Sequence, residues 1–470
     1  MKRFFTRFLA CVLVVSLAML ATERVEAKSK PQAKYVFYFI ADGISVNHIR
    51  GTEMYNAAVY GRDSILPFSR FTVRTLLTSH SASSAVTDSA AAATALATGV
   101  KTRNNYLGVD VDGQPLVNIA EVASRRGYKV GIATNVGINH ATPSAFYAHS
   151  QSRSDYTTIT DQLIASDVDF AAGSTFNCRR KSGIKPEDVV AQARAAGIEV
   201  VQSAEKAGKV KGRRVILLSD SLSRREMRFA TDRGEDEPTI VDYTEAAIKY
   251  LERESKGDGF FLMVEAGHVD YASHDNDAVT VFEEINDLSR SVSLALEFYE
   301  RHPDETLIVV TADHETGGMS IGYSSYKVNM ERLAHQRTSE EALTHKMQHM
   351  RKSGKTEWED MKALLSEYLG LWDKVKLREK DERNLRKTFE RNFLKDGEKV
   401  VGLYTSNEKM AAEAVRILNK RAYVNWIGLS HTAMQVPLYV KGAGELLFLD
   451  CYDNTDVPKR MATAMGCELK

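Results

Sequence analysis

Carboxylate and imidazole side chains recur in this sequence directly after apolar segments, or a few residues beyond them. They are Asp42, His140, Glu265, Asp270, His274, Asp313 and His314, and His431 lies just before a further apolar segment. Chance would scatter these residue types, because Asp and Glu are commonest on exposed helix faces. Asp and His without Cys predict zinc sites that keep open positions for water or substrate. Glu265 and the hydroxyl of Thr142 better suit a hard cation that prefers oxygen ligands, such as magnesium.

Each of these residues alone has a structural alternative. Asp42 would cap a turn after its strand, and Asp270 and His274, four apart, would form a pair on a helix surface. Asp313 and His314 are adjacent, so their side chains converge only if the chain makes a tight turn there.

Three other histidines are set aside. His345 and His349 also lie four apart, but no Glu accompanies them in a His-Glu-x-x-His motif, and we do not expect them to bind metal. His268 is expected only to fill space beside the site.

A second chemical signal is Ser89, which opens an Ala-rich stretch that runs to residue 97. Alanine is the best helix former, so Ser89 is predicted at or near a helix start. Ser89 would then be the helix cap, a role open equally to Asp88 or Thr87. Alternatively, Ser89 is a nucleophile at the positive end of the helix, where anions bind and a metal can activate the hydroxyl.

The elements that must position these residues alternate along the chain. Apolar runs rich in β-branched and aromatic residues span 35–40, 73–77, 129–134, 214–218, 260–264, 306–311 and 435–440. Amphipathic segments between them include 115–126, 242–254 and 281–301. Uninterrupted apolar strands separated by helices predict an α/β fold with a mostly parallel sheet, whose ligands bind beyond the carboxyl ends of the strands.

Residues from about 325 to 420 differ from the rest, because charges crowd together and few β-branched runs occur. We interpret this stretch as a largely helical insertion in a single α/β domain spanning 28–470. An independent helical domain is the competing interpretation.

Composition and the N-terminus narrow the class of protein. The chain of 470 residues is 43% apolar and 26% charged, and its 62 basic and 62 acidic residues cancel. These values are typical of a globular protein and lack the basic surplus of a nucleic-acid binder. Residues 1–27 have the basic, apolar and small-residue order of a secretory signal peptide, with a retained membrane anchor as the alternative.

The cysteines and the absence of glycosylation acceptor sites indicate the cellular compartment in which the protein works. Cys11 would leave with the signal peptide, and Cys178, Cys451 and Cys467 would remain. Cys451 and Cys467 are close enough in sequence to close a small disulfide loop in an exported protein. The sequence contains no Asn-x-Ser/Thr acceptor site, which favours a bacterial periplasmic or surface protein over a eukaryotic secreted one.

Several short motifs together resemble the alkaline phosphatase family. The strongest runs from Val86-Thr87-Asp88-Ser89-Ala90 to Thr98-Gly99-Val100-Lys101-Thr102. The others are Ile40-Ala41-Asp42-Gly43, Ala141-Thr142-Pro143, Val264-Glu265-Ala266-Gly267, Asp270-Tyr271-Ala272-Ser273-His274, Thr311-Ala312-Asp313-His314 and Ser430-His431-Thr432. They follow the family's order and cover roughly residues 35–325 and 425–442.

The resemblance implies a phosphomonoesterase that acts through a phosphorylated serine, Ser89, at a site with two zinc ions and one magnesium ion. It implies three ligand sets: Asp270, His274 and His431 for one zinc; Asp42, Asp313, His314 and Ser89 for the second; and Asp42, Thr142 and Glu265 for magnesium. It also implies that Arg153 binds the phosphate and that Asp88 orients Arg153.

Two residues depart from the family pattern. His140 stands near the third metal, where members have Asp or His, and its imidazole is softer than a carboxylate, so zinc or another ion is the alternative to magnesium there. Tyr271 stands where members commonly carry Lys or His, which puts phosphate affinity and the pH optimum in question but not the type of reaction.

The partners follow from these interpretations. We expect small phosphomonoester substrates, no nucleic acid, no membrane span after signal removal and, by the resemblance, a homodimer. Export to the periplasm is expected, with secretion or the cell surface as alternatives. Two other functions stay open: cleavage of phosphodiesters or sulfate esters, and binding of metal or phosphate without catalysis.

Overall fold

The computed structural model describes residues 33–61, 64–178, 183–219, 226–323, 326–395, 399–401, 403–404 and 406–469. The predicted signal peptide, residues 1–27, lies outside the described residues. Within the described ranges, no helix is both long and apolar enough to cross a bilayer. Cys178, Cys451 and Cys467 are free thiols, so no disulfide closes the loop between the last two.

A nine-stranded sheet forms the centre of the described structure. In spatial order its strands are β2 (Val73–Leu77), β15 (Val436–Gly442), β8 (Thr306–Thr311), β1 (Tyr35–Ala41), β7 (Phe260–Ala266), β3 (Lys129–Thr134), β4 (Phe170–Gly173), β6 (Val215–Leu218) and β5 (Glu199–Val201). β15 is antiparallel to both of its neighbours, and the other pairings are parallel. The predicted α/β fold with a mostly parallel central sheet is confirmed.

The central strands are apolar throughout because helices cover both faces of the sheet. Every residue of β1, β7 and β8 is buried. Aromatic side chains fill the core beside them: the ring of Phe37 lies 5.2 Å from that of Phe260 and 5.4 Å from that of Phe298.

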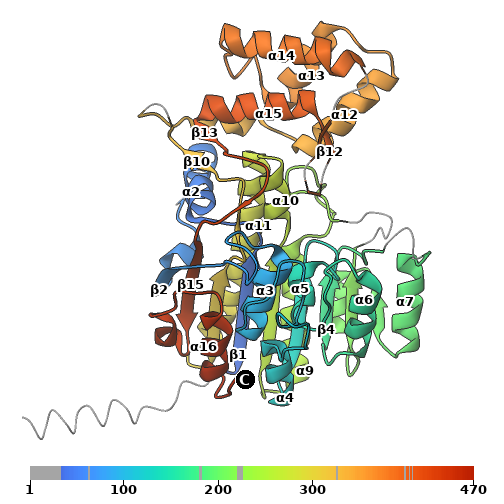
Figure 1. Ribbon diagram of the computed structural model, residues 1–470, viewed down its shortest axis with the longest axis vertical. Helices are drawn as coiled ribbons and strands as arrows, with labels where there is room; N and C mark the ends of the chain where they lie inside the picture. Colours follow the sequence, from blue (N-terminus) through green and yellow to red (C-terminus); the bar gives the residue numbers. More distant parts are fainter. Residues whose placement is uncertain are drawn as a thin grey trace, which may run out of the picture.

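Two groups of helices flank the sheet (Figure 1). In one, α9 (Ile240–Ser255) packs on α11 (Ala278–Arg301); in the other, α3 (Ser89–Thr98) packs on α4 (Ile119–Arg125), α5 (Ala141–Ser144) and α16 (Asp456–Ala464). The predicted helix over 115–126 begins later than expected, because Asn118 and Glu121 form a capping box that starts α4 at Ile119. Further helices are α2 (Val46–Tyr60), α6 (Tyr156–Ala165), α7 (Pro186–Ala195), α8 (Ala204–Lys209) and α10 (His268–His274).

A separate group of helices lies at one end of the molecule in Figure 1. It comprises α12 (Glu340–Lys352), α13 (Trp358–Leu369), α14 (Glu379–Arg391) and α15 (Lys409–Ala422). The two-stranded pair β11 (Lys399–Val401) and β12 (Ser406–Glu408) lies between α14 and α15 in the chain. Each helix buries one apolar stripe, such as Leu343 and Met347 on α12, and leaves its charged side in solvent.

Candidate active site

The carboxyl ends of the central strands, and the loops beyond them, bring the predicted site residues together. Asp42 follows β1, Glu265 lies on β7, Asp313 and His314 follow β8, Asp270 and His274 lie on α10, His140 and Thr142 follow β3, Ser89 begins α3, and His431 begins β14 (His431–Thr432). All of them are buried except His431, whose side chain is 9% exposed. This is the edge of the sheet at which ligands of open α/β folds bind.

Gly43 lets two of these elements approach each other. Its φ of +82° is in the left-handed region that favours glycine, and a Cβ there would lie 2.8 Å from the Cα of Asp270. Any other residue would therefore push α10 away from the end of β1.

Asp42, Asp313 and His314 form the first of three groups of potential metal ligands. His314 Nε2 lies 3.4 Å from Asp42 Oδ1 and 3.3 Å from Asp313 Oδ2. Asp313 is fixed through its other oxygen, which accepts hydrogen bonds from the backbone N–H groups of Gly43 and His314. Two carboxylates and one imidazole are a ligand set that zinc accepts.

The second group comprises Asp270, His314 and His431, and His274 lies beside it. His274 Nε2 is 3.3 Å from Asp270 Oδ2 and 3.2 Å from His431 Nε2. The Nδ1 atoms of His274 and His431 lie 2.6 and 2.9 Å from the carbonyl oxygens of Leu429 and Thr87. Because a carbonyl accepts from N–H, both rings direct an Nε2 lone pair into the group, as metal-binding histidines do.

The third group shares Asp42 with the first and adds His140 and Glu265. His140 Nδ1 is 3.8 Å from Glu265 Oε1, and Thr142 donates a hydrogen bond of 3.5 Å to Asp42 Oδ2. Thr134 donates to the other oxygen of Glu265 and so fixes that carboxylate.

Buried polar atoms without hydrogen bonds test whether these groups fit cations. Within the described residues such atoms include Asp42 Oδ1, Asp270 Oδ2, Asp313 Oδ2, Glu265 Oε1 and His140 Nδ1. Each belongs to one of the three groups, and leaving a buried polar atom unpaired costs free energy. The residues therefore fit divalent cations, which would satisfy these atoms.

The pKa shifts of the site residues also favour the binding of cations. Burial and then the Asp313 carboxylate raise the pKa of Asp42 well above its usual value, and burial and then Asp270 raise the pKa of Asp313 to about 8. Burial lowers the pKa of His274, but the Asp270 carboxylate outweighs burial and raises it to about 9. Carboxylates crowded together in a buried space hold protons unless a cation offsets their charge.

Ser89 lies between the first two groups. Its side chain is wholly buried at the start of α3, and its Oγ is 3.2 Å from His314 Nε2. The ring of His314 stacks on that of His431 with centroids 3.6 Å apart. Asp88, not Ser89 or Thr87, caps the helix through the Ala91 N–H, so the hydroxyl of Ser89 is not used as a cap.

Arg153 lies at the entrance to these groups, with its side chain 16% exposed. One guanidinium nitrogen, Nη1, donates to Asp88 Oδ2 at 3.2 Å. The other, Nη2, donates to the hydroxyl of Tyr404 at 3.2 Å and lies 3.1 Å from His140 Nε2. A guanidinium presents a planar fork that matches two oxygens of a phosphate.

The structure decides among the alternatives left open by the sequence. Asp270 and His274 are buried on α10, so the surface pair is wrong. Asp313 and His314 converge because β8 ends at Thr311 and the chain turns before β9 (Glu315–Thr316). His268 lies beside the site with Nδ1 3.7 Å from a buried carboxylate oxygen of Glu284, and it is absent from the three metal-ligand groups of the described residues.

Sequence reasoning missed Tyr404. It lies between β11 and β12, and its ring stacks on Tyr271 at 4.0 Å with an interplanar angle of 17°. The ring also lies 5.5 Å from that of His274 and 5.8 Å from that of His140. A lone tyrosine in a charged segment carries no pattern that would have identified it.

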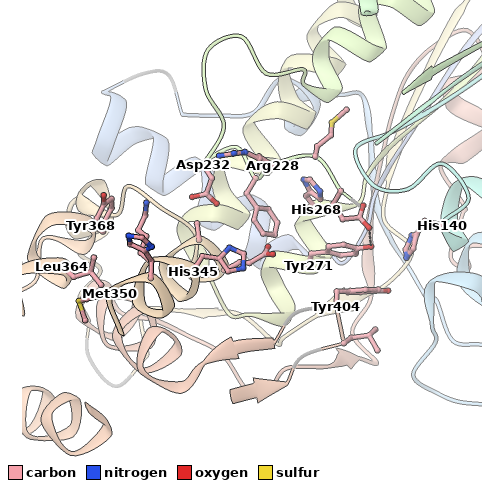
Figure 2. Close-up of a pocket in the computed structure, with 18 of the residues that line it drawn as sticks. His140, Arg228, Asp232, His268, Tyr271, His345, Met350, Leu364, Tyr368 and Tyr404 are labelled. Atoms are coloured by element: carbon pink, nitrogen blue, oxygen red, sulfur yellow. Dashed lines mark hydrogen bonds between the residues drawn. The ribbon is translucent and has the colours of Figure 1, made fainter. Parts of the chain in front are cut away.

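A cavity of about 1580 Å³ extends outward from the site (Figure 2). Asp88, His140, Arg153 and His431 line its inner end. His345 and His349 from α12 also line it, although neither belongs to a metal-ligand group in the described part of the chain.

A mostly parallel α/β sheet with three clusters of carboxylates and imidazoles around a buried serine defines a metal-dependent hydrolase. The profile of the alkaline phosphatase family matches residues 33–467. The chain belongs to the alkaline phosphatase family and is a phosphomonoesterase.

Individual relatives agree with the family match. Alkaline phosphatase 4 of Bacillus subtilis (strain 168) is 29% identical over 450 residues, which are 93% of this chain and 90% of the relative. The cold-active alkaline phosphatase from the psychrophile Shewanella sp. superposes with a TM-score of 0.77 at 25% identity, covering 92% of this chain and 99% of that one. The Thermus thermophilus alkaline phosphatase gives a TM-score of 0.74 at 25% identity, covering 94% of each chain.

Proposed function

We propose that the protein hydrolyses phosphate monoesters to an alcohol and inorganic phosphate through a phosphoserine intermediate on Ser89. The single observation that carries this proposal is the placement of the Ser89 hydroxyl. It is wholly buried at the N-terminus of α3, 3.2 Å from His314, and it follows Asp88, the partner of Arg153, in the chain. A hydroxyl that does not cap its own helix, at the positive end of that helix, is suited to attack an anionic phosphate.

The three ligand groups would hold two zinc ions and one magnesium ion. Asp42, Asp313 and His314 suit one zinc, and Asp270, His274 and His431 suit the other. Asp42, Thr142 and Glu265 suit magnesium, and His140 beside them makes zinc the alternative ion there. When bound, these cations supply the positive charge that stabilises the attacking and leaving oxygens.

The chain's own residues account for the remaining requirements of the reaction. Arg153 holds two phosphate oxygens, and Asp88 fixes Arg153 in position. Ser89 Oγ loses its proton to solvent and attacks the phosphorus. The ester P–O bond breaks, and its electron pair leaves with the alcohol oxygen, which takes a proton from water. A water oxygen then attacks the phosphorus, Oγ leaves and is reprotonated, and inorganic phosphate is released.

The experiment is hydrolysis of a chromogenic phosphate monoester by the full chain, beside a bis-ester and a sulfate ester, each with and without a chelator. Turnover of the monoester should be chelator-sensitive and should fall on the order of 10³-fold or more in Ser89→Ala. Ser84→Ala, in the exposed loop just before, is the matched control and should act like the wild type. Wild-type turnover by Ser89→Ala would refute the nucleophile, and preference for the bis-ester or sulfate would refute the substrate class.

We also propose that 28–470 is one α/β domain and that the helical segment at about 325–420 covers the site. The cavity supports this arrangement, because its lining includes both Arg153 and residues of α12 and α13. Homodimer formation and export to the periplasm stay predictions. Sedimentation would test the first, and the N-terminal sequence of the mature protein would test cleavage after Ala27.

A further inference from the structure

The cavity is far larger than a phosphate group requires. Its volume of about 1580 Å³ exceeds the roughly 300–1,000 Å³ of pockets that enclose drug-sized ligands. Ser89 lies at the buried floor of the site, while Arg153 and His431 line the inner end of the cavity. An in-line displacement places the leaving alcohol opposite the nucleophile. The alcohol part of the substrate would therefore extend into this cavity.

The part of the cavity next to the phosphate position is aromatic. Figure 2 shows Tyr271 and Tyr404 between His140 on one side and His345 on the other. The two tyrosine rings stack at 4.0 Å, and the Tyr404 hydroxyl accepts a hydrogen bond from Arg153. Tyr271 is only 6% exposed, so Tyr404 offers the aromatic surface, one hydrogen bond away from the group that would hold the phosphate, and Tyr271 supports it.

The outer part of the cavity is formed by the helical segment. Met350 of α12 and Ala363, Leu364 and Tyr368 of α13 supply apolar and aromatic surface. Both acidic and basic side chains border this region. The acidic residues are Glu341, Asp360 and Glu367, and the basic or titratable ones are His345, Lys346, His349 and Lys355. No single sign of charge dominates, so the cavity favours bulk and aromatic character over a particular charge on the alcohol.

We propose that the cavity is a leaving-group subsite for phosphate monoesters of bulky aromatic alcohols, whose ring packs against Tyr404, which Tyr271 supports from behind. This inference rests on the proposed function, because it assigns the substrate class of the same site. Aromatic packing and burial of apolar area on this surface would strengthen binding of the ester in its ground and transition states.

The test compares ethyl phosphate with 2-(2-naphthyl)ethyl phosphate. The naphthyl ring is two carbons from the ester oxygen, so the two alcohols leave almost equally well and the ratio of their kcat/KM values reports binding. The wild-type enzyme should prefer the naphthyl ester by about tenfold or more. Tyr404→Ala removes one ring of the stack, and Ala363→Trp narrows the outer cavity. Each should reduce the preference to about twofold or less.

Controls separate the subsite from general damage. Tyr404→Phe keeps the ring and should keep the preference. Glu359→Trp introduces the same side chain as Ala363→Trp on the same helix, at a position that is 78% exposed and does not line the cavity. It should leave both kcat/KM values unchanged.

Three results would overturn the inference. They are equal kcat/KM values for the two esters in the wild type, a preference untouched by both Tyr404→Ala and Ala363→Trp, and an equal loss of preference in Glu359→Trp. Failure to hydrolyse either ester would instead refute the proposed function itself, so the two failures are distinguishable.

Discussion

The carboxylate of Asp88 contacts both the start of α3 and Arg153, so substitutions of Asp88 should affect stability and activity separately. Its Oδ1 accepts a hydrogen bond of 3.0 Å from the Ala91 N–H and so caps the N-terminus of α3, the helix that carries Ser89. Its Oδ2 accepts from Arg153 Nη1 at 3.2 Å and from the Asn105 N–H at 3.0 Å. Asp88→Asn keeps an oxygen for the cap but turns an amide N–H₂ toward two donors, whereas Asp88→Ala removes all three contacts.

The size of each effect follows from these contacts. A hydrogen bond to a charged group contributes about 1.5–3 kcal/mol, so loss of the Arg153 contact should lower kcat/KM by about 10- to 100-fold in both variants. Loss of an N-cap costs about 1 kcal/mol, so Asp88→Ala should be less stable than Asp88→Asn by about that amount.

Two measurements check the prediction: kcat/KM on a chromogenic monoester, and the free energy of unfolding in urea. Ser203→Ala is the matched control, because Ser203 caps α8 through the Lys206 N–H. It should lose about 1 kcal/mol of stability and no activity. Wild-type kcat/KM in Asp88→Asn would refute the positioning of Arg153, and equal stability of the two Asp88 variants would refute the cap.

Three further predictions concern other parts of the site. Arg153→Lys should lower kcat/KM by about tenfold or more, with a raised KM, because an ammonium cannot hold two phosphate oxygens in one plane; an unchanged KM would contradict this role. Gly43→Ala should destabilise the fold by at least about 1–3 kcal/mol in urea unfolding, because its φ is +82° and the new Cβ meets Asp270; wild-type stability would contradict the close approach. A chelator should lower both activity and thermal stability, and zinc with magnesium should restore both, since a ligand at 1,000 times its Kd stabilises the fold by about 4 kcal/mol. A melting temperature that is insensitive to the chelator would contradict binding at these groups.

Much of the fold could be predicted because its central strands are buried on both faces. Such strands, like residues 306–311, are continuous apolar runs whose limits are visible in the sequence. The starts of helices were less certain, since a single capping side chain such as Asn118 decides them.

The candidate site was predictable where its residues follow strands, as Asp42 and Asp313 do, because a parallel sheet gathers its carboxyl ends at one edge. Tyr404 was not predictable, because it reaches Arg153 from the distant segment between β11 and β12. That His345 and His349 border the cavity could not be predicted, because the cavity depends on how α12 packs against the rest of the chain, which no local sequence pattern encodes.

The order of strands also has a consequence for how the protein folds. In the part of the chain that the structure describes, β2 pairs within the sheet only with β15, which lies near the opposite end of the sequence. His431 precedes β15 by a few residues. Formation of β15 therefore both pairs β2 at the edge of the sheet and brings the candidate ligand His431 to the site. Such long-range pairing is slow, so the sheet and the site are completed only when β15 joins β2, late in folding.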